Sequence, residues 1–80
     1  MTRVLNSHEY VLLRRELIAA REAAGLTQVE LAAKLARTQS FVSKYEKGER
    51  RLDVIDFLMV CRGLDVEPSE LIRLVDHKKG

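Results

Sequence analysis

Residues 27–48 read TQVELAAKLARTQSFVSKYEKG, and this stretch decides the fold. It begins with Thr27-x-x-Glu30, the pattern of a capping box. In that motif the threonine hydroxyl accepts a hydrogen bond from the backbone N–H of Glu30, and the glutamate carboxylate accepts one from the N–H of Thr27. Both bonds satisfy backbone groups at the start of a helix, so the pattern predicts a helix over residues 28–35.

A second short helix follows after a turn. Thr38 is a preferred N-cap residue and Gly48 a preferred stop, which predicts a helix over residues 39–47. Two helices that cross steeply need a small residue at the crossing point, and Ala32 supplies it. The inward positions are apolar: Leu31, Leu35, Val42 and Tyr45. The outward positions of the second helix are polar: Gln39, Ser40, Ser43 and Lys44.

Capping and stop residues predict further helices on both sides of this pair. Ser7 caps a first helix, whose apolar residues recur at helical spacing until Gly25 ends it. Asp53 caps a fourth helix that runs to Arg62, with Gly63 as its stop.

Pro68 suits the first turn of a last helix. The apolar side of this helix is formed by Leu71, Ile72, Leu74 and Val75. The predicted fold class is all-α: a compact five-helix domain with a helix-turn-helix at its second and third helices. A single domain spans residues 1–80, with a core over about residues 7–75 and frayed ends.

The positive charge is concentrated in the middle of the chain. The 80 residues carry a net charge of +2, but residues 34–51 alone carry six basic and two acidic residues. The preceding segment is balanced, and the following one is net negative. A basic stretch beside a polar helix face indicates either a contact surface for nucleic-acid phosphates or a solvated face.

Several function classes are excluded by what the sequence contains. The single cysteine, Cys61, lies in the apolar run 57–61, which indicates a buried small hydrophobe and a reducing compartment. That run is too short to span a membrane, and Ser7-His8-Glu9 interrupts any secretory signal. We therefore expect a cytoplasmic protein that makes no contact with a membrane.

No catalytic or metal-binding pattern stands out. His8 and His77 have no cysteine or carboxylate at ligand spacing, so we expect neither a metal nor another cofactor. Asp53 and Asp56 share one helical turn, but a cap and an exposed neighbour account for them. With no nucleophile–base arrangement and no Gly-rich phosphate loop, the sequence predicts that the protein is not an enzyme.

The motifs together resemble the Cro/CI-type helix-turn-helix family, also called the XRE family of phage and bacterial regulators. The resemblance covers about residues 10–75. Its matching residues are Arg21, Gly25-Leu26-Thr27-Gln28, Glu30-Leu31-Ala32, Leu35, Thr38-Gln39-Ser40, Val42-Ser43-Lys44, Glu46, Gly48, Arg50 and the Pro68-Ser69-Glu70-Leu71 start of the last helix. The family implies a DNA-binding domain whose second motif helix lies in the major groove.

Two turn residues depart from the family pattern. Ala36 stands where the family usually has glycine, so a left-handed turn would cost on the order of 1 kcal/mol unless the turn is reshaped. Arg37 stands at a usually apolar position, where its stem can cover the turn while its guanidinium reaches a phosphate.

The resemblance also implies roles for individual residues. Base contacts in the major groove fall to Gln39, Ser40 and Lys44. Contacts with the DNA backbone fall to Gln28, Thr38, Ser43, Arg37, Arg50 and Arg51. Arg21 and Glu46 match the family's ion pair between the first helix and the end of the recognition helix. Phe41 either meets a thymine methyl group or packs against the following loop.

A regulator with one reading helix needs a second copy for useful specificity. The sequence therefore predicts a homodimeric transcriptional regulator, a repressor on a two-fold symmetric operator in double-stranded DNA. Its candidate interface is Ile72, Leu74 and Val75 on the last helix. Two alternatives stay open: an antitoxin that also holds a toxin partner, and a protein-interaction module without sequence-specific DNA binding.

Overall fold

Five α-helices begin where the capping residues and Pro68 predict them. A computed structural model describes residues 7–76, and the expected frayed ends, residues 1–6 and 77–80, lie outside the described residues. The helices are α1 (His8–Ala23), α2 (Gln28–Leu35), α3 (Gln39–Lys47), α4 (Val54–Leu64) and α5 (Pro68–Val75). Between residues 7 and 76 there is no strand, and no helix is long and apolar enough to cross a membrane. The predicted all-α five-helix fold is confirmed.

Four of the helices begin with a side-chain cap. The Thr27 capping box is complete, with the hydroxyl accepting from Glu30 N–H at 3.0 Å and the Glu30 carboxylate accepting from Thr27 N–H at 2.9 Å. Ser7, Thr38 and Asp53 cap α1, α3 and α4, each by accepting from the backbone N–H three residues further on. The start of α5 has no side-chain cap, but Pro68 occupies its first turn and brings no N–H that needs a partner.

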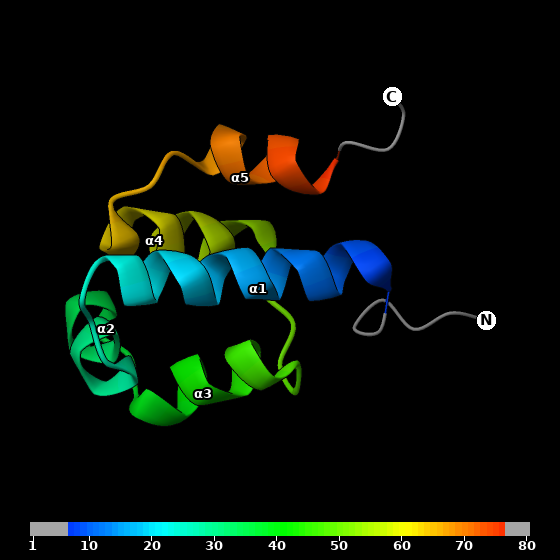
Figure 1. Ribbon diagram of the computed structural model, residues 1–80. Helices are drawn as coiled ribbons and strands as arrows, with labels where there is room; N and C mark the ends of the chain where they lie inside the picture. The colour runs from blue at the N-terminus through cyan, green and yellow to red at the C-terminus, as the bar shows by residue number, and fades with distance from the viewer. Residues whose placement is uncertain (1–6, 77–80) are drawn as a thin grey trace.

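Helix α1 passes through the middle of the molecule, with α3 and α5 on opposite sides of it (Figure 1). Helix α2 packs against both α3 and α4. The buried core is aliphatic with a few aromatic rings: Leu17, Leu31, Ala32, Leu35, Phe41, Val42, Tyr45, Phe57, Val60, Cys61, Leu64 and Leu71. Since α3 reaches this core through one side only, its other side is free for a partner.

The turn between α2 and α3 is left-handed at Ala36, with φ 57° and ψ 40°. The backbone N–H of Arg37 donates to Ala32 O at 3.0 Å, and that of Ala36 to Ala33 O at 3.2 Å. This pair of bonds is the Schellman arrangement, which satisfies the last carbonyls of a helix. The sequence left open a left-handed or a reshaped turn, and the structure has the left-handed one.

The predicted end of the fourth helix is wrong. Helix α4 continues through Gly63 to Leu64, and the left-handed residue that closes it is Asp65, with φ 59°. Gly63 has a different role, because a Cβ atom there would lie 2.5 Å from Cδ2 of Leu35. The glycine therefore allows α4 to approach α2 closely, and this reason lies in tertiary packing and not in the local sequence.

The only cysteine of the chain is part of the core. Cys61 is fully buried in α4, as its apolar surroundings in the sequence predict. Desolvation, with a smaller contribution from the charge of Glu67, raises the pKa of its thiol from 9.0 to about 11. Because a thiolate is the reactive form, the folded protein holds this group in an inert state.

Replacing Ala36 with glycine is expected to stabilise the protein. Glycine adopts the left-handed conformation without the Cβ strain of alanine, which should raise the free energy of unfolding by about 1 kcal/mol. In a domain of this size that corresponds to a rise in Tm of about 4–8 °C in thermal denaturation. The matched control is Ala33→Gly, at an exposed position inside α2, which should lower stability by about 0.5–1 kcal/mol. Shifts of the same sign in both variants would contradict the strain at Ala36.

The Cys61 thiol is expected to resist modification by Ellman's reagent at pH 8. The rise in pKa from 9.0 to about 11 lowers its thiolate fraction about 100-fold, and burial blocks access of the reagent as well. Reaction of the native protein should therefore be at least ~100-fold slower than in guanidinium chloride. Since the chain has one cysteine, the signal has a single source. Equal rates in both states would show that α4 opens readily.

Candidate nucleic-acid interface

The outward face of α3 is polar and accessible. The helix buries Phe41, Val42, Tyr45 and Glu46 against the rest of the molecule. Three of the four predicted outward residues are exposed, namely Gln39, Ser40 and Lys44, while Ser43 is half-buried. These side chains offer amide, hydroxyl and ammonium groups along a helix narrow enough for the major groove of B-DNA.

A buried carboxylate holds α3 against α1. Arg21 donates from Nε to Glu46 Oε2 at 2.8 Å and from Nη2 to Oε1 at 3.1 Å, so the ion pair expected from the sequence is present and bidentate. Its remaining nitrogen, Nη1, donates to Leu26 O at 2.8 Å. The hydrogen bonds with Glu46 raise the pKa of Arg21 further above its ordinary value. The guanidinium and the carboxylate are thus held in one position and one orientation.

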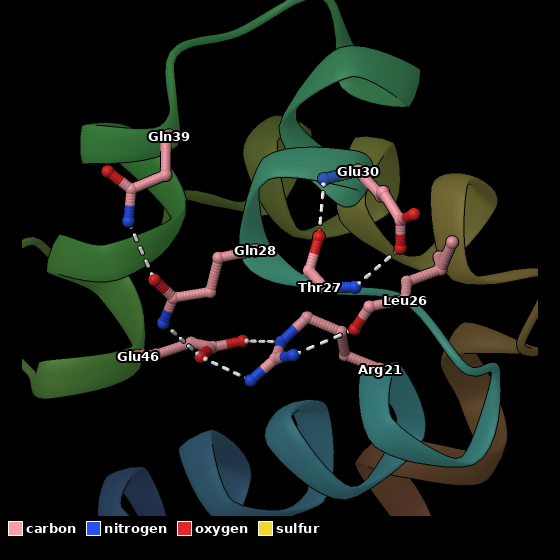
Figure 2. A network of polar contacts seen from close by, with 7 residues as sticks. All are labelled: Arg21, Leu26, Thr27, Gln28, Glu30, Gln39 and Glu46. Atoms are coloured by element: carbon pink, nitrogen blue, oxygen red, sulfur yellow. Dashed lines mark hydrogen bonds and ion pairs between the residues drawn. The ribbon is translucent and has the colours of Figure 1, made fainter.

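Two glutamines extend this network to the surface (Figure 2). Gln28, at the start of α2, donates from Nε2 to Glu46 Oε1 at 2.9 Å. Its own Oε1 accepts from Nε2 of Gln39, the first residue of α3, at 2.8 Å. A continuous chain of hydrogen bonds therefore runs from Arg21 in α1 to the exposed Gln39.

A second arginine of α1 contacts the end of α3. Arg14 donates from Nη1 to the backbone oxygen of Glu46 at 2.9 Å. The same guanidinium fills the space beside Gly48, where a Cβ atom would lie 2.8 Å from Arg14 Cζ. Two arginines of α1 therefore hold Glu46, one through its backbone oxygen and one through its carboxylate, which limits rotation of α3 about its own axis.

Two more arginines flank the start of α3. The guanidiniums of Arg37 and Arg50 lie over the Phe41 ring, at 4.9 Å and 5.0 Å from its centre. Both also approach the Asp56 carboxylate, at 3.5 Å and 3.4 Å. Their side chains remain almost half exposed, so both can reach a ligand while they are held in place. With Lys44 and Ser40 they line an open groove beside α3.

The contacts of Arg37 and Arg50 correct the expectation that Asp56 is exposed and decide between the two alternatives for Phe41. Asp56 is only 8% exposed, not an exposed neighbour of the α4 cap, because the two arginines cover its carboxylate. Phe41 is buried and meets Tyr45 edge to ring, with centroids 5.5 Å apart. Of the two alternatives for Phe41, the structure thus favours packing against the loop that carries Arg50.

The other predicted residues are distributed over two surfaces. Thr38 caps α3 through its hydroxyl, and Arg51 is exposed in the loop after α3. Helix α5, which carries the candidate interface residues, lies across α1 from α3, as Figure 1 shows. Ile72 and Leu74 are 49% and 52% exposed, whereas Val75 is half-buried.

Sequence reasoning missed the Arg14 contact, the link from Glu46 to Gln28 and the role of Asp56. It also missed Val54 and Ile55, two exposed apolar residues in the first turn of α4. A local pattern was available for the last pair, because both are apolar residues that directly follow the Asp53 cap. The other contacts join residues from different helices and have no local signal.

The fold and this surface define a helix-turn-helix DNA-binding protein. A sequence model of a helix-turn-helix family matches residues 17–71, which is more than half of the chain. The chain belongs to this family, the XRE or Cro/CI type. Proteins of the family are DNA-binding regulators of transcription and not enzymes, so the chain is a DNA-binding transcription regulator.

Solved structures agree with this assignment. An XRE-family like protein from Pseudomonas syringae pv. tomato str. DC3000 is 50% identical, with a TM-score of 0.85 over 90% of this chain and 88% of that chain. The restriction-modification controller protein C.AhdI from Aeromonas hydrophila is 33% identical, with a TM-score of 0.72 over 79% and 91%. The clp gene regulator ClgR from C. glutamicum, at 19% identity, a TM-score of 0.78 and coverage of 94% and 97%, shares the fold alone. A comparison with curated proteins gives no match.

Proposed function

We propose that the protein is a homodimeric repressor that reads a two-fold symmetric operator with α3 in the major groove. The observation that carries the proposal is the exposed polar face of α3, flanked by the two guanidiniums that Phe41 and Asp56 hold. One face of a rigidly held helix thus supplies hydrogen-bonding groups for bases, and its flank supplies charge for phosphates.

Base contacts fall to Gln39, Ser40 and Lys44, the exposed residues of that face. A glutamine amide pairs with adenine through N6 and N7, and lysine prefers the O6 and N7 acceptors of guanine. Serine contacts several bases and discriminates little. Each good bidentate pair contributes about 1–3 kcal/mol of discrimination against a wrong base.

Backbone contacts fall to the residues around this face: Gln28, Thr38, Ser43, Arg37, Arg50 and Arg51. The Thr38 hydroxyl uses its oxygen to cap α3, which leaves its hydrogen free to donate to a phosphate. Arg37 and Arg50 line the groove beside α3, and Arg51 is exposed in the loop after it. Such contacts set the register of a protein on DNA without carrying sequence information themselves.

The proposed dimer uses α5. The apolar arc of this helix is covered by its own chain only at the centre, where Leu71 is buried and Val75 half-buried. Ile72 and Leu74 flank that centre and are exposed. A second copy would cover them and place two recognition helices about 34–36 Å apart, one turn of DNA.

Repression is the regulatory effect that requires the fewest contacts beyond DNA binding itself. A compact dimer bound over a promoter excludes polymerase by occupying the site, with no further contact. Similarity to a restriction-modification controller protein supports a small regulator that acts through DNA binding itself. The cytoplasm of a bacterial cell is the compartment that this function requires.

Selection of binding sites from a random duplex library at near-physiological salt tests the reading of bases. The wild-type protein is expected to enrich a symmetric motif, and Gln39→Ala to relax the preference at one position in each half-site. Arg62→Ala, which removes an exposed side chain of α4, is the control and should leave every preference unchanged. If no motif is enriched and binding vanishes steeply with salt, the contact is only electrostatic and the repressor proposal is wrong. A toxin or another protein partner would then be sought.

Ile72→Glu is expected to produce monomers with weak operator affinity. A buried carboxylate without a partner is costly, so the charge should disrupt an interface that covers Ile72. The control is Val29→Glu, which adds the same charge at an exposed apolar residue of α2. Sedimentation equilibrium measures the mass of both variants. A dimer that persists in Ile72→Glu would rule out α5 as its interface.

A further inference from the structure

We propose that Glu46 is a specificity-determining positioning residue. Through Gln28, it sets the order in which Gln39 presents its hydrogen-bond acceptor and donor to a base. This inference rests on the proposed reading of bases by α3 and extends it to a residue that touches no DNA. The juxtaposition behind it is the hydrogen-bond chain from Glu46 to Gln39 (Figure 2).

The first step is the fixed chemistry of Glu46. Its side chain is 5% exposed, and both carboxylate oxygens accept from Arg21. An ionised carboxylate has acceptors only, so any amide that faces it must present its NH2 group. The bidentate pair also holds the carboxylate plane in one direction.

The second step follows at Gln28. Since Oε1 of Glu46 can only accept, Gln28 must turn Nε2 toward it, which is the 2.9 Å contact observed. The carbonyl oxygen of the same amide then faces Gln39 and can only accept as well. Rotating the amide by half a turn would bring two oxygens together at one end and two NH2 groups together at the other. The charged carboxylate therefore selects one of the two orientations.

The third step reaches the base-reading surface. Gln39 must turn Nε2 toward Gln28, at 2.8 Å, and one of its amide hydrogens is used there. Its Oε1 and its second hydrogen remain free, with the oxygen on the side away from Gln28 (Figure 2). An acceptor beside a donor in this order matches the N6 amino group and N7 of adenine. The amide of an exposed glutamine would otherwise sample both orders.

A purely structural Glu46 would behave differently. If its carboxylate did no more than join α1 to α3, its loss would lower stability and weaken binding to every DNA sequence by a similar factor. A residue that orients Gln39 must also change the preference for one base at one position. This ratio of affinities separates the two roles.

The test compares Glu46→Gln and Gln28→Met with the wild-type protein. Glu46→Gln replaces the acceptor-only group with an amide that can face Gln28 in either orientation. Gln28→Met removes the link and keeps the Arg21–Glu46 ion pair, so it carries the test if Glu46→Gln fails to fold. Arg14→Met is the matched control, because it removes another polar contact between α1 and α3 without touching the amides.

Affinities are measured on the selected operator and on duplexes altered at the position that Gln39→Ala identifies. In both Glu46→Gln and Gln28→Met, the preference for the selected base should fall about tenfold at that position and stay unchanged elsewhere. Arg14→Met should lower all affinities equally. An unchanged preference in Gln28→Met, while Gln39→Ala relaxes it, would overturn the inference that Glu46 orients Gln39 through Gln28, and would leave the proposed function intact. A wild-type protein that selects no motif would overturn both.

A measurement without DNA checks the same chain of hydrogen bonds. The side-chain amide protons of Gln39 are observed by NMR in the wild-type protein and in Gln28→Met. One of them should lose its downfield shift and its protection from exchange in the variant, because its acceptor is gone. Identical signals in both proteins would show that Gln39 is not held by Gln28, and the inference would fall.

Discussion

The recognition surface depends on one buried carboxylate. Glu46 lies on the inner side of α3, so its charge is removed from water and needs a fixed partner. Arg21 provides that partner from α1, and the backbone of Leu26 holds the arginine in turn. A buried pair of this kind need not add net stability, because desolvation offsets its attraction. Its effect is directional, because it fixes one orientation of α3 against α1. That orientation determines where the exposed side chains of α3 lie.

Much of the fold could be predicted because helix starts are local. Ser7, Thr27, Thr38 and Asp53 cap helices through backbone groups three residues away, so sequence spacing alone identifies them. Ala36 is less certain from sequence, which left open a left-handed or a reshaped turn, and the structure has the left-handed one. Gly63 shows where local reasoning ends. Glycine suits both the end of a helix and a close contact between two helices. Only the position of Leu35 in the fold shows that Gly63 has the second role.

The site follows the same division. Periodicity alone indicates which residues of α3 face outward, and Gln39, Ser40 and Lys44 are exposed. The role of Asp56 depends on two arginines from separate loops, 19 and 6 residues away, and no spacing rule joins them. The bond between Gln28 and Glu46 depends likewise on how α2 and α3 cross. Polar partners from different helices are the part of a site that a single sequence conceals, and here they hold the residues that it does reveal.

Asp56 gives the basic flank a built-in counterion. The electrostatic part of DNA binding is driven by small ions released when cationic side chains replace them at the phosphates. Arg37 and Arg50 already share a carboxylate in the free protein, so part of their charge is neutralised before DNA arrives. The flank therefore attracts any duplex less strongly than two unpaired arginines would. Less of the protein is then held on the unrelated sequences that make up most of a genome.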